Sequence, residues 1–362
     1  MVATFTTPHM ANANNNREIQ GHVHSGSSET AIPLPAVTVN LYKSNNVAPQ
    51  LLGTTSTDAA GNFSIKSKPG GKSSDGVFYA MADLGGGLQL VSIIGPTLRD
   101  FVTINELTTV AAGYAMAQFK NDGVLSGDLF ALHIAAGMND NLVAPARGDW
   151  SSVMLSGPNG DQTNSLRSTS SLANILALFV RNGGQDIDSF FALTTPPEGT
   201  PTTNFLQALS NIARFPQQNV AEIFALTTQV SAFSPSLVLM PDAWTLVVKV
   251  NDTGDDNYLF GGPGNLAFDS SGYAWITNNV VQGTPNSSQF TVVLKPNRQP
   301  ADGQCGRRRS CPMRMATFGL PVLATIAFMF SLRAILTAPS FSRNQMDAGP
   351  SISNSRATEL PG

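Results

Sequence analysis

Short runs in which apolar and polar residues alternate dominate residues 18 to 94, and this period of two constrains the fold more than any other feature. The alternating positions are Ile19, Gly21, Val23, Val37, Val39, Leu41, Phe63 and Ile65. A strand with one buried face shows this pattern. Further strands fit residues 77–82 and 88–94, on either side of a turn at Gly85–Gly87. Five such strands predict a β-sandwich.

Composition limits the class of protein. With 362 residues and 42% apolar content, the chain has material for two or three domains, each with its own core. Charged residues make up 12% and the net charge is −3, so no basic surplus is present to hold nucleic acid. The 32 glycines and 23 prolines favour turns and short strands, as in secreted β-rich proteins. We therefore expect an extracytoplasmic or secreted protein without a nucleic-acid partner.

The first residues carry no visible export signal. Residues 1–17 are polar and rich in Asn, and they lack a basic segment followed by an apolar one. We expect residues 1–16 to form a disordered N-terminus, with the start misassigned or the export signal missing.

Three segments of the sandwich region carry a resemblance to a known family. They are Gly21–Val23, Pro35–Tyr42, and Thr57–Phe63 with Asp58 and Gly61 in its turn. In this order they resemble the carboxypeptidase-regulatory-like (transthyretin-like or Cna-B-like) sandwich domain, which we assign to residues 17–100. The resemblance implies a structural role as a spacer or an adhesion module.

Residues 101–240 change to a helical period, and we expect a helical linker region here. Thr103 is predicted to cap a helix, with Glu106 closing a capping box and Val102 packing on Leu107. Further helices are predicted at 169–182, 204–214 and 220–229, the last with Asn219 as its cap. Long polar loops between them predict a loosely connected layer. The strings 103–111 and 171–176 resemble the linker that precedes an NHL-type or virginiamycin-B-lyase-like propeller in bacterial proteins.

Residues 241–303 resemble one repeat of such a propeller. Predicted strands at 244–250, 264–278 (a hairpin) and 290–295 would form a four-stranded blade. Asp269 and Gly272 form the hairpin turn, because Gly accepts a positive φ and Asp bonds its own turn. Trp275 is expected to pack between blades. Propellers need several blades, so the resemblance implies that this is the first blade of a truncated one.

The composition shifts after Gly303, and residues 304–362 support two interpretations. The apolar run 318–336 approaches the length of a membrane helix. However, Arg307–Arg309 before it would place residues 1–304 in the cytoplasm, which conflicts with an exported protein. The alternative is an out-of-frame tail, in which the apolar run is an accident of translation.

A codon argument makes the out-of-frame interpretation testable. Residues 312–321 can be encoded so that reading two bases later gives Asp-Ala-Asn-Gly-Asn-Leu-Trp-Val-Thr, the hairpin motif again. The hidden Asp falls at position 313, 44 residues after Asp269, which matches a blade of about 40–45 residues. We predict that sequencing the gene across and beyond codons 295–362 reveals further Asp-x-x-Gly-x-x-Trp hairpins in the shifted frame. If the shifted frame holds none, the membrane interpretation stands instead.

Candidate metal ligands are few. His22 and His24 form an H-x-H on a predicted strand, which places both rings on one face, although no third ligand is apparent. Asp252, Asp255 and Asp256 form an oxygen-rich loop that could hold Ca²⁺, but the spacing differs from that of an EF-hand. Exposed strand histidines and a solvated turn explain both patterns without a metal. No cofactor is otherwise evident.

The sequence thus predicts a multidomain, mainly β protein with a helical middle. No catalytic set and no G-x-S-x-G nucleophile motif are visible, which favours a non-enzymatic extracytoplasmic binding or scaffold protein of unknown ligand. The expected partner is an unknown protein or a carbohydrate. One alternative is a fragment of a virginiamycin-B-lyase-like or lactonase-like propeller enzyme. Another is a C-terminally membrane-anchored protein, if the run 318–336 is genuine.

Overall fold

A computed structural model describes residues 18–66, 76–121, 124–250, 263–269, 272–278, 291–297 and 328–329. The chain is a mixed α and β protein with several sheets, in which almost all strand pairs are antiparallel. The helices α1–α8 all fall between residues 106 and 227, within the segment where the sequence predicts helices. The predicted disordered segment 1–16 lies outside the described residues.

The first sheet is built around β1 (Glu18–Ser25). On one side β5 (Asn62–Lys66) pairs with it in antiparallel register, and on the other β8 (Phe101–Ile104) pairs in parallel. The short β2 (Ile32–Pro33) pairs with the end of β1. Because β8 belongs to this sheet, the sheet extends past the boundary that the sequence predicted near residue 100.

The second sheet has the strand order β4-β3-β6-β7. Its strands are β4 (Gln50–Ser56), β3 (Thr38–Ser44), β6 (Val77–Asp83) and β7 (Gln89–Gly95). The sequence did not predict β4, since the pairing of β3 with β4 shifts between Leu41 and Tyr42 and leaves Leu52 as an extra residue. A bulge of this kind breaks the period of two.

The inner faces of the two sheets share one hydrophobic core, which includes Ile19 and Phe63 of the first sheet and Leu41 and Leu90 of the second. Inside this core, the absence of a side chain at Gly21 lets Phe63 and the backbone of Val102 lie close to it. A Cβ atom at Gly21 would lie 2.3 Å from Cζ of Phe63 and 2.4 Å from the carbonyl oxygen of Val102. The predicted motif residues Gly21 and Phe63 therefore meet in the core.

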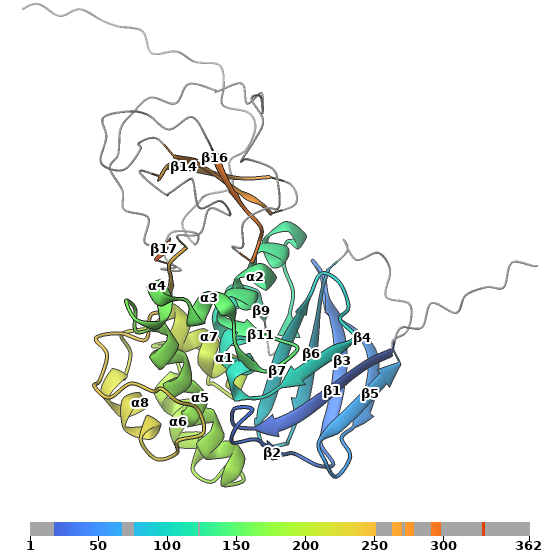
Figure 1. Ribbon diagram of the computed structural model, residues 1–362. Helices are drawn as coiled ribbons and strands as arrows, with labels where there is room; N and C mark the ends of the chain where they lie inside the picture. The colour runs from blue at the N-terminus through green and yellow to red at the C-terminus, as the bar shows by residue number, and fades with distance from the viewer. Residues whose placement is uncertain are drawn as a thin grey trace, which may run out of the picture.

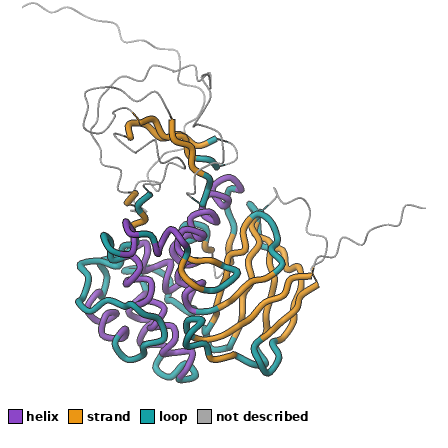
Figure 2. The backbone as a smooth tube through the Cα atoms, in the orientation of Figure 1, coloured by secondary structure: helices purple, strands orange, loops and turns teal. Residues whose placement is uncertain are grey.

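The helices gather on one side of the paired sheets (Figures 1 and 2). Helices α1 (Glu106–Ala115), α2 (Leu129–Leu142) and α7 (Phe205–Arg214) cover the outer face of β6 and β7. The remaining helices are α3 (Ser152–Leu155), α4 (Gly157–Gly160), α5 (Ser165–Arg181), α6 (Ile187–Thr194) and α8 (Val220–Thr227). Three two-residue strand pairs complete the described secondary structure: β9 (Lys120–Asn121) with β10 (Val124–Leu125), β11 (Val143–Ala144) with β12 (Asp149–Trp150), and β13 (Val247–Val248) with β17 (Phe328–Met329).

The prediction of a loosely connected helical layer is wrong for the described residues. The core of the sheets continues without interruption into α1, α5, α6 and α7. Residues 129–142, which the sequence left as a loop, form α2 because Leu132, Ala135 and Ala136 bury against the sheet. Tertiary burial here outweighs the weak helix propensity of Gly and Asn in this segment.

Two predicted helix caps also differ. Thr103 lies in β8, where it pairs with His22, and the cap of α1 is Asn105. The Asn105 side chain accepts a bond from the Thr108 N–H at 2.9 Å, and the Thr108 hydroxyl accepts one from the Asn105 N–H at 3.0 Å. Glu106 is therefore not the box residue. Asn219 does precede α8, but its side-chain amide donates to the carbonyl of Leu193.

Polar side chains of α5 bind a largely irregular segment, residues 229–250, which we call the strap. Oδ1 of Asn174 accepts from the N–H groups of Ala232 and Phe233, each at 2.8 Å, and its Nδ2 donates to the Phe233 carbonyl. The Ser171 hydroxyl accepts from the N–H of Leu237 at 2.9 Å. Since the strap lacks a strand partner over this stretch, these side chains satisfy its backbone groups.

The end of the strap is bound in the same way. The Ser165 hydroxyl bonds both the N–H and the carbonyl of Val247 at 2.7 Å. The Asn159 amide bonds both backbone groups of Lys249, at 2.7 and 2.8 Å. These side chains bind the backbone groups of the strap in addition to the pairing of β13 with β17.

Of the predicted first strand of the blade, only Val247–Val248 forms a strand, and this strand pairs with β17. Trp244 is fully buried in the shared core, and its carbonyl accepts a bond from the Tyr114 hydroxyl at 2.8 Å. Among the described residues, the sheet contains β14 (Pro263–Phe268), β15 (Ala274–Asn278) and β16 (Thr291–Leu294), in that order. The predicted hairpin is present, whereas Trp244, Leu246 and Val248 pack in the core shared with the helices. Val250 also packs against the apolar residues of the three-stranded sheet.

The three-stranded sheet approaches α2 after β16. A Cβ atom at Gly137 of α2 would lie 2.3 Å from the carbonyl carbon of Pro296.

In the described part of the chain, no helix combines the length and the apolar character needed to cross a bilayer. Most of the apolar run 318–336 lies outside the described residues.

We predict that Asn174→Ala destabilises the protein strongly. The change leaves two N–H groups and one carbonyl of the buried strap without partners, which costs about 2–4 kcal/mol in the free energy of unfolding. Urea denaturation measures this loss. Asn46→Ala is the matched control, since Asn46 is exposed, and it should change stability little. Equal effects of the two substitutions would contradict the role of Asn174.

Candidate functional site

The predicted histidine pair lies on the outer face of β1. The two rings lie 5.1 Å apart between centroids, as the H-x-H spacing predicted. Nε2 of His22 bonds the carbonyl of Ala60 at 2.6 Å, while His24 is 4% exposed. In the described ranges, no three His, Cys, Asp or Glu side chains converge in a way that could hold a metal. The predicted calcium ligands Asp252, Asp255 and Asp256 lie outside those ranges.

The predicted turn motifs adopt the geometry that the sequence suggested. The Asp58 side chain accepts bonds from the N–H groups of Ala60 and Asn62, at 2.9 and 2.8 Å. These bonds, with the Asn62 N–H as the largest contribution, lower the pKa of the Asp58 carboxyl. Gly61 follows with a φ of +79°, which a residue with a Cβ adopts only with strain.

The second turn closes the hairpin between β14 and β15. Oδ1 of Asp269 accepts from the N–H of Tyr273 at 3.0 Å, and its Oδ2 accepts from Nε1 of Trp275 at 2.9 Å. Gly272 has a φ of +79°. The spacing Asp-x-x-Gly-x-x-Trp therefore has a physical basis, because one carboxylate fixes both the turn and the Trp side chain.

The outer face of the first sheet carries a row of three unlike side chains. In the strand register, Gln20 of β1 lies between Phe101 of β8 and Ser64 of β5. Phe101 is 43% exposed, although the face around it is polar. A shallow cavity of about 490 Å³ opens here, and its lining includes this row together with Thr55 and Asn62. The sequence does not predict this site, because Val102 and Thr103 also fit the start of a helix.

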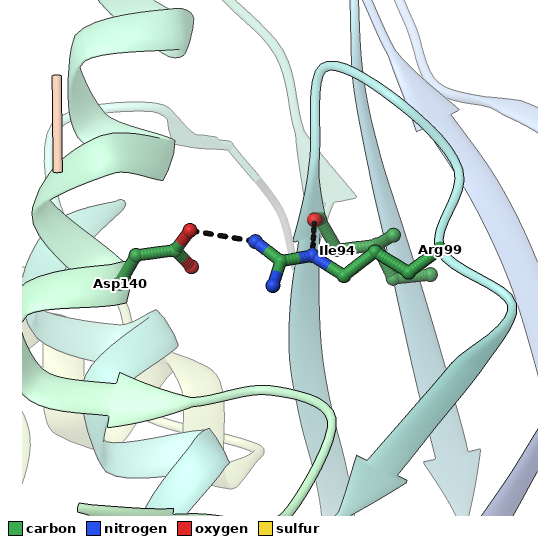
Figure 3. Close-up of polar contacts among 3 residues, drawn as sticks. All are labelled: Ile94, Arg99 and Asp140. Carbon is green, nitrogen blue, oxygen red and sulfur yellow. Dashed lines mark hydrogen bonds and ion pairs between the residues drawn. The ribbon is translucent and has the colours of Figure 1, made fainter. Parts of the chain in front are cut away.

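The position of Phe101 depends on the loop before it. Nε of Arg99 donates to the carbonyl of Ile94 at 2.7 Å, and its guanidinium pairs with Asp140 of α2 at 2.6 Å (Figure 3). The carbonyl of Asp100 accepts from the Gln20 N–H at 3.0 Å. Burial raises the pKa of Asp140, and Arg99 opposes this shift. The ion pair thus links α2 to the loop that leads into the cavity.

A polar joint lies at the other end of β1, formed by the buried residues His24, Ser25, Gly26 and Glu106 and by the exposed Arg181. Glu106 is fully buried, and its Oε2 accepts from the Gly26 N–H at 2.9 Å. Nε of Arg181, at the end of α5, donates to the Ser25 hydroxyl at 3.0 Å. Burial raises the pKa of the Glu106 carboxyl, although the Ser25 hydroxyl, the Gly26 N–H and the Arg181 charge all oppose the shift.

His24 is held neutral in this joint. Burial first, and then the neighbouring His22, lower its pKa from 6.5 to about 4, against a smaller opposing effect of Asp149. Its Nδ1 has no hydrogen-bond partner among the described residues. Protonation would therefore place an unpaired charge inside the protein.

We predict that acid destabilises the protein through His24. The pKa in the folded state lies below 6.5, so the unfolded chain takes up the proton first as the pH falls. The free energy of unfolding therefore decreases between pH 6.5 and about 4, by about 3 kcal/mol in total. Glu106 contributes with the opposite sign, since its raised pKa costs stability as the pH rises.

Urea denaturation across this pH range measures the dependence, and the His24→Gln variant should lose the contribution of His24 to it. His133→Gln, at a half-buried histidine of α2, is the control that should keep the full dependence. An unchanged pH dependence in His24→Gln would show that His24 is not the responsible group.

Comparisons with known proteins do not assign this chain to a family. No protein-family model matches, and no curated protein matches. Among solved structures, the chain is similar to a 9R-lipoxygenase from Cyanothece, at 15% sequence identity and a TM-score of 0.17. This likeness covers 22% of the chain and 12% of the lipoxygenase chain, and it carries no argument about fold or function.

Proposed function

We propose that this chain is a non-enzymatic, extracytoplasmic binding or scaffold protein, and that the outer face of β8, β1 and β5 is its binding surface. The observation that carries the proposal is the cavity beside Phe101, Gln20 and Ser64. An exposed aromatic ring among polar groups is typical of binding surfaces, because the ring supplies contact area and the polar groups supply direction.

The arrangement of the two sheets supports this role. Helices cover the outer face of β6 and β7, so that side contributes to the hydrophobic core. The face that carries Phe101 is instead polar and accessible in its described part. The second sheet and its helices then act as a rigid support.

We also propose that the two sheets form a carboxypeptidase-regulatory-like sandwich, and that β14–β16 belong to an NHL-type or virginiamycin-B-lyase-like blade. The bonds of Asp269 to Tyr273 and Trp275 support the second assignment, since they give the repeated Asp-x-x-Gly-x-x-Trp spacing a structural reason. In this proposal, the sandwich is a spacer and binding module ahead of a propeller.

We predict that the protein binds a ligand at this face without changing it. Full-length protein is incubated separately with neutral oligosaccharides, acidic oligosaccharides and a peptide library, and hydrogen–deuterium exchange is followed by mass spectrometry. The expected result is slower exchange in residues 18–25, 62–66 and 101–104 with at least one class. The ligand should be recovered with its mass unchanged.

Two results would contradict the proposal. One is turnover of the bound ligand, which would indicate an enzyme. The other is an absence of protection at this face with all three classes, which would remove it as the binding surface.

A further inference from the structure

The lining of the cavity contains no positively charged side chain. Of the ten lining residues, Asp58 alone is ionisable. Its carboxylate already accepts from the N–H groups of Ala60 and Asn62 and from the Asn62 side-chain amide at 3.3 Å. Ligands recognised through a negative charge, such as phosphates, therefore find no positive counter-charge in this lining.

The other polar groups of the lining are amides and hydroxyls. Gln20 contributes an amide, and Thr55 and Ser56 contribute hydroxyls. The Ser64 hydroxyl donates to Glu18 and can still accept. Groups that both donate and accept are complementary to a ligand whose own groups do both, and the hydroxyls of a sugar have this property.

Phe101 supplies the apolar part of the recognition. Its ring is 43% exposed, and in the strand register it lies directly beside Gln20. A pyranose ring has one face of C–H groups and an edge of hydroxyls, so it can cover the Phe101 ring while its hydroxyls bond Gln20 and Ser64. Covering an exposed aromatic ring removes apolar surface from water.

The size of the cavity favours a small ligand over a folded partner. Its volume of about 490 Å³ falls within the range of small-molecule sites, whereas specific protein interfaces spread over a much larger and flatter area. An open, shallow cavity also lets a chain of sugar units extend beyond it on either side.

We infer that the cavity beside Phe101, Gln20 and Ser64 binds a neutral oligosaccharide. The inference rests on the proposed binding function of this face and adds the class of ligand.

The test compares the full-length protein with single substitutions. Affinities for cellohexaose, xylohexaose, mannohexaose and maltohexaose are measured by isothermal titration calorimetry, with an oligogalacturonate and a peptide library as the other ligand classes. Phe101→Ala should weaken binding of the preferred neutral sugar at least about tenfold. Gln20→Ala should also weaken it, and Phe101→Tyr should retain it because the ring remains.

Phe130→Ala is the matched control, because Phe130 of α2 is 38% exposed and lies in another part of the fold. This substitution should leave the affinity unchanged, and circular dichroism should show that every variant is folded.

The outcomes separate the inference from the proposed function. Neutral-sugar binding that is lost in Phe101→Ala but kept in Phe130→Ala supports both. Binding of the oligogalacturonate or of peptides alone, with the same dependence on Phe101, overturns the carbohydrate inference and retains the binding face. Neutral-sugar binding that is insensitive to Phe101 overturns the inference at this cavity. If no class binds, both proposals fail.

Discussion

The joint at Gly26 is the contact on which the rest of the structure depends. The first turn of α1 holds this residue from both sides, because the Glu106 carboxylate accepts from its N–H and the Asn105 amide donates to its carbonyl at 3.3 Å. Asn105 also caps α1, and Arg181 brings the end of α5 to Ser25. One polar cluster therefore fixes the sheet and two helices relative to one another.

Such a joint is stable only if its buried ionisable groups stay neutral, since Nδ1 of His24 and Oε1 of Glu106 have no hydrogen-bond partner among the described residues. The pKa values of His24 and Glu106 both shift toward the neutral form, as expected for groups taken out of water. Along the strap, the side chains of Asn174, Ser171 and Ser165 bind backbone groups. Buried polar side chains thus specify this arrangement, while the hydrophobic core supplies most of the driving force.

The sequence predicted the elements that follow a simple period and missed those that tertiary contacts define. The strands around Val23, Leu41 and Phe63 were predictable, because one face of each is buried and the other is polar. Strand β4 was not predicted, because the bulge at Leu52 interrupts its alternating pattern. Thr103 was predicted to cap a helix, because a Thr hydroxyl is common at helix caps and Thr is also common in strands. The cavity beside Phe101 was not predictable, since Phe101 becomes unusual only when its polar neighbours across the strands are known.

The hairpin at Asp269 and the segment at Trp244 show the same difference between elements set by local bonds and elements set by tertiary contacts. The turn was predictable because all of its bonds are local. The predicted first strand of the blade forms only at Val247–Val248, because the apolar run that begins at Trp244 suits the core against the helices as well as it suits a blade. Local chemistry fixes turns, whereas the partner of an apolar segment depends on the whole fold.

Through the joint at Gly26, the two sheets and the helices form one cooperative unit. Native-state hydrogen exchange measures it most directly, through the free energies of opening for amides in β6 and in the middle of α5. We expect the slowest amides of β6 and of α5 to exchange at the same free energy of opening, equal to the free energy of global unfolding. Exchange of α5 at a clearly lower free energy, while β6 stays protected, would contradict it.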